Sequence, residues 1–102
     1  MQFGTAMPAA NTLTKLAQVP AGLSAVVNLN VCNTGVGDAK IRFAISSKEI
    51  PDPSEYYEWD TVLSPTAVLE RTALSLSAGY SIFVYATTSA IAFNAHGEQE
   101  VA

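Results

Sequence analysis

Two carboxylates, Glu58 and Asp60, have a spacing that could support acid–base chemistry. On an extended strand, residues two positions apart project from one face and lie about 7 Å from each other, which overlaps the carboxylate separations of glycoside hydrolases. Any strand with an acidic exposed face has this spacing, so we favour a solvated or interface face over a catalytic pair. The chain also lacks a Ser-His-Asp elbow, a phosphate loop, a CxxC pair and a dinucleotide-binding fingerprint. We therefore predict that it is not an enzyme.

Metal ligands are few in this sequence. The single histidine, His96, stands near the C-terminus, and the nearest acids, Glu98 and Glu100, fall in the polar C-terminal segment 96–102. Because metal sites normally need three or four ligands, we predict a surface histidine and no metal. The acids of residues 52–60 lack the pattern of a calcium loop. Cys32 is the single cysteine, so an intramolecular disulfide is excluded. We expect no cofactor.

The aromatic residues Tyr56, Tyr57 and Trp59 stand among the acids and could form a binding surface. Aromatic rings beside acids recur at protein interfaces and in sugar sites. An alternative places Trp59 and Tyr57 in the core and leaves only Tyr56 exposed. We take these three residues, together with Glu58, as candidate partner-binding residues.

Composition favours a protein that works in an assembly. The chain of 102 residues is 49% hydrophobic but only 14% charged, with a net charge of −4. A single domain of this size with so few charges must expose neutral surface, as protein interfaces do. The five cations are scattered, so we expect no nucleic-acid partner. No apolar run approaches the roughly 20 residues that a bilayer requires, and the N-terminus does not resemble a signal peptide, so we expect no membrane association.

The segment Leu23–Cys32 is the clearest structural element, because its apolar residues alternate for ten positions as in a half-buried strand. Its opposite face carries Asn28 and Asn30, which are polar but uncharged. A free surface would normally carry Lys or Glu there. We therefore add these two asparagines to the candidate partner-binding residues.

Similar short segments separated by Gly and Pro turns follow along the chain. We predict an all-β fold, an antiparallel β-sandwich (jelly-roll or Ig-like) of about seven to eight strands. Residues 33–38 are expected to form a hairpin loop that pairs Leu23–Cys32 with Ala39–Ser46 around one core. The strands are predicted at residues 12–19, 23–32, 39–46, 56–62, 66–74, 80–87 and 90–95.

The two ends of the chain are expected to lie outside the sandwich. Residues 1–10 form an N-terminal arm in this prediction, with Phe3 and Met7 as its candidate contacts to a partner. Residues 11–98 form the β-sandwich domain, and residues 99–102 form a C-terminal tail.

The chain from Ala10 to Glu98 resembles small virion structural proteins of tailed bacteriophages. The matching runs are V-P-A-G (Val19 to Gly22), V-N-L-N-V-C-N (Val27 to Asn33), I-R-F-A-I (Ile41 to Ile45), E-Y-Y-E-W-D (Glu55 to Asp60), V-L-E-R-T (Val68 to Thr72) and L-S-A-G-Y (Leu76 to Tyr80).

The resemblance implies a β-sandwich that coats or joins parts of a virion. We expect a capsid decoration (cement) protein that binds at capsomer junctions and stabilises the head. Its partners would be the major capsid protein or another virion protein, together with further copies of itself as a dimer or trimer. It would be assembled into virions in the host cytoplasm. A small tail, neck or fibre component is the alternative within the virion, and a carbohydrate-binding module is the alternative of another class.

Overall fold

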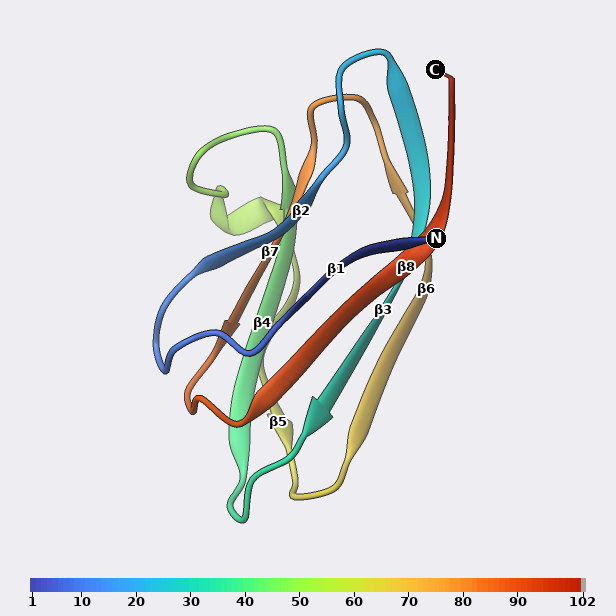
Figure 1. The fold of residues 1–102 in the computed structure, drawn as a ribbon. Helices are drawn as coiled ribbons and strands as arrows, with labels where there is room; N and C mark the ends of the chain where they lie inside the picture. Colours follow the sequence, from blue (N-terminus) through green and yellow to red (C-terminus); the bar gives the residue numbers. More distant parts are fainter. Residues whose placement is uncertain (102) are drawn as a thin grey trace.

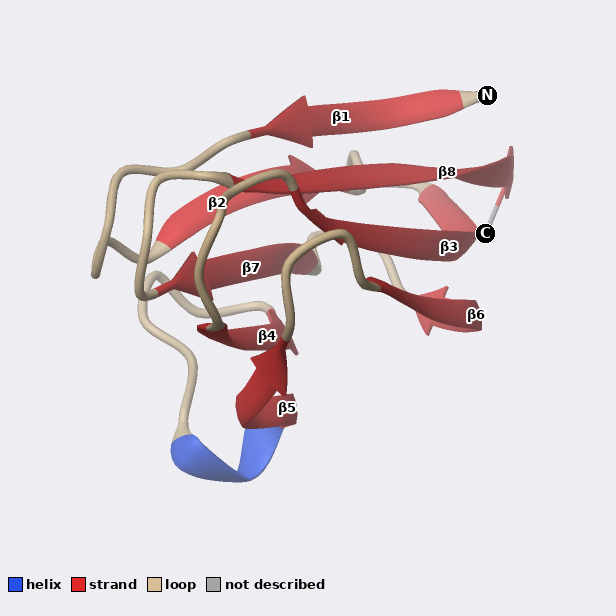
Figure 2. Cartoon of the chain, turned by 90° about the horizontal axis from the view of Figure 1, so that it is seen from below, coloured by secondary structure: helices blue, strands red, loops and turns tan. Residues whose placement is uncertain are grey.

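A computed structural model describes residues 1–101 of the chain and shows an all-β sandwich of two four-stranded antiparallel sheets (Figures 1 and 2). This confirms the predicted fold class. Within the described residues, the helical content is a single 3₁₀ turn, η1 (Pro53–Glu55), and no helix is long and apolar enough to cross a membrane. The strands are β1 (Gln2–Ala6), β2 (Thr14–Gln18), β3 (Leu23–Asn33), β4 (Ala39–Ser46), β5 (Tyr56–Leu63), β6 (Val68–Leu76), β7 (Ser81–Ala86) and β8 (Ile91–Val101).

The strand order identifies the sandwich as a jelly roll. One sheet, called the β3 sheet below, has the order β1-β8-β3-β6, and the other, the β4 sheet, has the order β2-β7-β4-β5. Strand β1 therefore pairs with β8, β2 with β7, β3 with β6 and β4 with β5. The chain therefore folds as one long hairpin of paired strands. The hairpin rolls up so that successive strand pairs lie alternately in one sheet and in the other, which is the jelly-roll arrangement. The immunoglobulin strand order is excluded.

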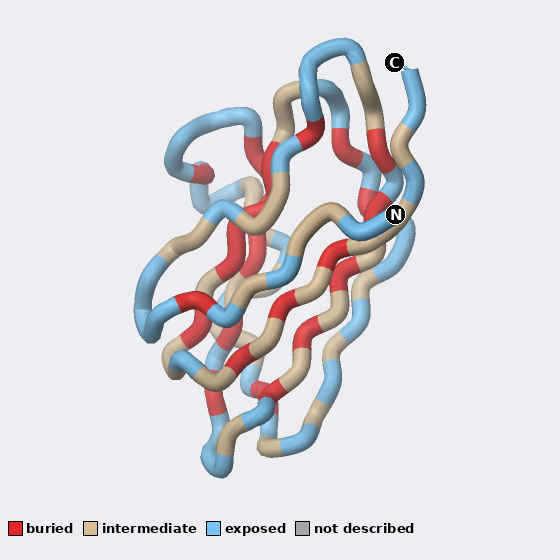
Figure 3. The backbone as a smooth tube through the Cα atoms, in the orientation of Figure 1, coloured by how far each residue is buried: buried red, intermediate tan, exposed pale blue. Residues whose placement is uncertain are grey.

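One hydrophobic core fills the space between the sheets. Along β3, Ala25, Val27, Leu29 and Val31 are buried and alternate with residues that are exposed or half-buried, as the sequence predicted (Figure 3). The inward residues of β4 join the same cluster, and Phe43 is completely buried in it. The prediction that these two strands contribute to one core is confirmed.

The prediction that β3 and β4 pair as a hairpin is wrong. Strand β3 pairs with β6 and β8, whereas β4 pairs with β5 and β7, so the connection crosses from one sheet to the other. The buried Asn33 fixes this crossing, because its Nδ2 donates hydrogen bonds to the carbonyls of Gly37 and Leu63 and its Oδ1 accepts one from the N–H of Gly35. Alternation of apolar residues specifies the buried face of a strand but not its neighbour.

The N-terminal arm expected at residues 1–10 is instead largely an edge strand. Strand β1 pairs with β8, and Phe3 packs against the core, so it is not free to reach a partner. Met7, beyond the end of β1, is 55% exposed. The expected tail is also incorrect, because β8 continues to Val101; residue 102 lies outside the described part. Both segments gain their structure from pairing with strands distant in the sequence, β1 with β8 and residues 99–101 with the start of β3, which no local pattern reveals.

Each of the four edge strands contains an irregularity, whereas the central pairs β3–β8 and β4–β7 keep an unbroken register. Bulges of this kind twist an edge away from the straight geometry that another strand needs for pairing. Strand addition at these edges is therefore disfavoured. The register shifts lie between Gln2 and Gly4 in β1, between Lys15 and Ala17 in β2, between Arg71 and Leu74 in β6, and between Tyr56 and Glu58 and between Glu58 and Thr61 in β5.

We predict that Gly97→Ala destabilises the fold by about 2 kcal/mol or more, since it forces the central strands β3 and β8 apart. A Cβ atom at Gly97 would lie 2.0 Å from the carbonyl oxygen of Val26, which cannot move without breaking the ladder. Urea denaturation measures the loss.

Gly37→Ala is the matched control, because a Cβ atom there meets nothing within 4 Å. Equal stability of the two variants would contradict the close packing at Gly97.

Candidate functional site

The outer face of the β4 sheet carries an arginine in contact with two aromatic rings. The guanidinium carbon of Arg42 on β4 lies 3.7 Å from the ring centroid of Trp59 on β5 and 4.7 Å from that of Tyr85 on β7. A cation over an aromatic face is attracted by the quadrupole of the ring. We call Arg42, Trp59, Tyr85, Tyr56 and Asp60 the aromatic–arginine cluster.

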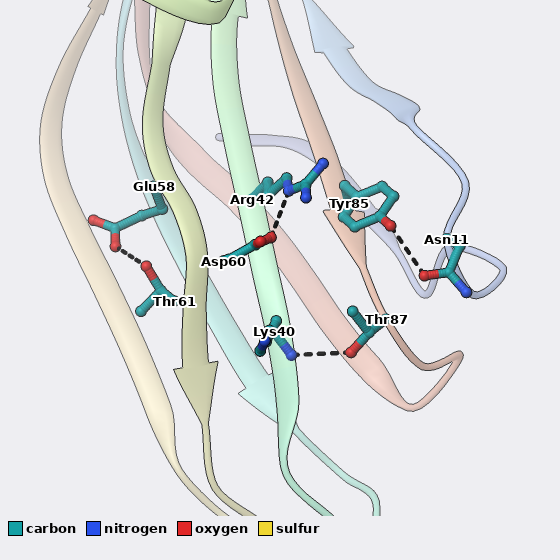
Figure 4. Close-up of polar contacts among 8 residues, drawn as sticks. All are labelled: Asn11, Lys40, Arg42, Glu58, Asp60, Thr61, Tyr85 and Thr87. Carbon is teal, nitrogen blue, oxygen red and sulfur yellow. Dashed lines mark hydrogen bonds and ion pairs between the residues drawn. The ribbon is translucent and has the colours of Figure 1, made fainter.

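A bulge in β5 brings Asp60 to this arginine. The backbone of Asp60 has a φ of 53°, a left-handed conformation that Asp tolerates better than most residues. Its Oδ1 accepts a hydrogen bond of 2.6 Å from Nε of Arg42 (Figure 4). This hydrogen bond lowers the pKa of the Asp60 carboxyl below its ordinary value. The same contact raises the pKa of Arg42, so the pair is ionised at neutral pH.

The rings of the cluster are also held in place. Tyr56 meets Trp59 edge to face, with ring centroids 4.9 Å apart. The Tyr85 hydroxyl donates a hydrogen bond of 3.0 Å to Oδ1 of Asn11, in the loop before β2 (Figure 4). Nevertheless, 56% of Trp59 is exposed. The cluster thus holds an exposed aromatic ring in a fixed position.

Neither Tyr57 nor Trp59 is a core residue, so the alternative that left only Tyr56 exposed is wrong. Tyr57 is 54% exposed and stacks on the buried Phe43, with ring centroids 5.4 Å apart. Tyr56 is half-buried. Both exposed rings belong to the edge strand β5. Its bulges break the alternation of inward and outward residues, on which the placement of Tyr57 and Trp59 in the core depended.

Glu58 and Asp60 do not form a carboxylate pair. Figure 4 shows them pointing to opposite sides of β5. Glu58 accepts hydrogen bonds from Nε of Arg71, at 2.9 Å, and from the hydroxyl of Thr61, at 2.6 Å. Arg71 belongs to β6, so this ion pair links the edges of the two sheets. Each carboxylate is therefore neutralised by its own arginine, as in ion pairs that stabilise a fold.

The candidate asparagines lie together on the outer face of the β3 sheet. Oδ1 of Asn28 accepts a hydrogen bond of 3.0 Å from the backbone N–H of Ala73, whose φ of 57° marks the bulge in β6. Asn28 therefore stabilises this edge. Asn30 pairs with Asn94 of β8 across the ladder. Both candidates are half-buried, and the structure separates them from the aromatic–arginine cluster by the whole core.

Sequence reasoning missed Arg42 and Tyr85. Both stand on strands that were predicted, but only the register between β4, β5 and β7 places them beside Trp59. The sequence did show that Arg42 lies between the apolar Ile41 and Phe43 and therefore projects from the outward face of its strand. No group of three metal-ligating side chains lies anywhere in residues 1–101.

Comparisons of the chain with protein-family models, with curated proteins and with solved structures found no match. The resemblance to virion proteins of tailed bacteriophages stays a prediction.

We predict that Asp60→Asn lowers the free energy of unfolding at neutral pH and makes this free energy depend less on pH in the acidic range. Because folding lowers the pKa of Asp60, its contribution is fully present above the unfolded value of about 3.9 and is lost as the pH falls through the folded pKa. Urea denaturation should be measured at pH values above and below this range. The free energies of unfolding of the wild type and of Asp60→Asn should become equal in acid.

Glu49→Gln is the control for charge alone, since Glu49 is exposed in the loop before η1. A constant difference between the wild type and Asp60→Asn across the window would contradict the ion pair.

Proposed function

We propose that this chain is a structural protein of a tailed-bacteriophage virion, and specifically a decoration (cement) protein that binds at capsomer junctions and stabilises the head. The observation that carries the proposal is the exposed aromatic–arginine cluster on one outer face of a jelly roll. Jelly rolls recur in viral capsid and lectin domains, which supports the proposal by analogy of fold. The sequence resemblance points to the same class.

The cluster has the composition of a protein-binding surface. Trp, Tyr and Arg are the residue types that most often dominate binding energy at interfaces. Asp60 and Asn11 already hold Arg42 and Tyr85, so binding would cost little side-chain entropy. A protein that binds only the assembled shell stabilises that shell by mass action.

This fold favours binding of a partner through the outer faces of the sheets over strand addition at their edges. All four edge strands are interrupted by bulges, and β1, which was expected to reach a neighbour as an arm, is paired with β8. The proposed protein therefore binds its neighbours with its outer faces. A small tail, neck or fibre component would use the same surface, and its position in the particle separates it from a decoration protein.

A carbohydrate-binding module is the second candidate, because Trp59 and Tyr57 expose more than half of their surface. Sugars stack on flat aromatic faces, but Arg42 occupies one face of Trp59 and Tyr56 stands at 89° to it. The rings therefore form no flat platform. A glycan array with a signal that Trp59→Ala abolishes would favour this candidate over the virion protein.

We predict that Trp59→Ala reduces retention on virions by at least about tenfold, as expected for the loss of an interface anchor. The measurement is co-sedimentation of the purified protein with particles assembled without it, followed by cryo-electron microscopy of the complex. Added density should lie at capsomer junctions.

Val36→Ala is the control, because Val36 is a fully exposed apolar residue in the loop between β3 and β4. Wild-type retention of Trp59→Ala, or heads that are equally stable with and without the chain, would refute the proposal.

A further inference from the structure

The outer face of the β3 sheet is acidic. Its charged side chains are Glu70, Glu98 and Glu100, which lie opposite the outward positions of β3 and are exposed. The one cation in the four strands of this sheet is Arg71, which lies opposite the buried Leu29 and binds Glu58 instead of projecting from this face. The centre of the face is polar and uncharged.

The exposed unpaired charges on the outer face of the β4 sheet are positive. Lys15 on β2 and Lys40 on β4 are exposed there, whereas Asp60 is paired with Arg42 and Glu55 accepts a hydrogen bond from Ser46. Lys15 lies 5.7 Å from the ring centroid of Phe83, on the same face as Tyr85. The two lysines and the aromatic–arginine cluster therefore share one surface, and this surface complements the acidic face on the other side of the molecule.

We propose that copies of this chain associate face to back, with the acidic outer face of the β3 sheet in one copy docked on the aromatic–arginine face of the next. The inference rests on the proposed function, which takes that cluster as a protein-contacting surface, and it names a second copy as the partner. The bulged edges leave the two faces as the extended surfaces available for docking.

The charges of the two faces favour this arrangement. A contact between two β3-sheet faces would set acids against acids, whereas the face-to-back contact sets them against lysines. The β4 sheet is the smaller one: four strands of five to eight residues side by side give its outer face a projected area of about 400 Å². A standard interface buries about 800 Å² per partner, so we expect this contact to be smaller and weaker than a standard one.

The geometry of the contact restricts the assembly. Because the two surfaces that meet are different, the assembly as a whole keeps one free surface of each kind, at its two ends, until a ring closes. A closed trimer or larger ring, or an open filament, is compatible with this contact. A two-fold symmetric dimer is not.

A charge exchange tests the inference. Glu98→Lys with Glu100→Lys makes the β3-sheet face basic, and Lys15→Glu with Lys40→Glu makes the β4-sheet face acidic. We expect the wild type to self-associate in analytical ultracentrifugation, more weakly as salt is raised. Each double variant alone should associate at least about tenfold more weakly. An equimolar mixture should associate more strongly than either variant alone, since each junction between the two kinds of copy is again between opposite charges.

A monomeric wild type at millimolar concentration, a mixture that associates no more strongly than either variant alone, or self-association unchanged in Lys15→Glu with Lys40→Glu would overturn the inference. Circular dichroism of each variant shows whether it is folded. If the charge variants keep self-association while Trp59→Ala loses virion retention, the face-to-back contact fails and the virion function stands. If Trp59→Ala is retained normally, the proposed function itself fails.

Discussion

The unbroken pairing of β3 with β8 is the constraint on which the rest of the structure depends. Eleven consecutive residue pairs join the first long strand to the last, without a register shift. Gly97 lies within this ladder, where the carbonyl of Val26 leaves no room for a Cβ atom. Strands β1 and β6 then take the flanks of the sheet, and the rolled hairpin places β2, β7, β4 and β5 in the second layer. The regular centre thus fixes two extended faces.

The irregular edges and the regular centres have different consequences for binding. Bulges at the four edges oppose strand addition, and the Glu58–Arg71 ion pair links β5 to β6 across one side of the sandwich. What is left for a partner is the broad outer surface of each sheet. One surface presents Trp59 with Arg42 and the other presents acids around an uncharged centre. The proposed role in an assembly depends on these two surfaces.

Local patterns in the sequence predicted every strand except β1 but did not predict which strands pair. The alternation over Leu23–Cys32 identified β3 and its buried face, because burial on one side imposes a period of two. The same pattern could not reveal that β4 lies in the other sheet. In β5, the left-handed backbone at Asp60 turns Glu58 and Asp60 to opposite sides, and a non-glycine residue gives no warning of such a bulge. The contact of Arg42 with Trp59 needed the register between β4 and β5.

Hydroxyl-radical footprinting of the protein bound in virions, compared with the free protein, tests most directly whether the sheet faces make its contacts. Aromatic and sulfur-containing side chains are the reactive ones, and both kinds are exposed here. We expect Trp59 and Tyr85, on the outer face of the β4 sheet, to become protected while Met7, beside the β1 edge, stays reactive. Protection of Met7 together with an unprotected Trp59 would contradict the account.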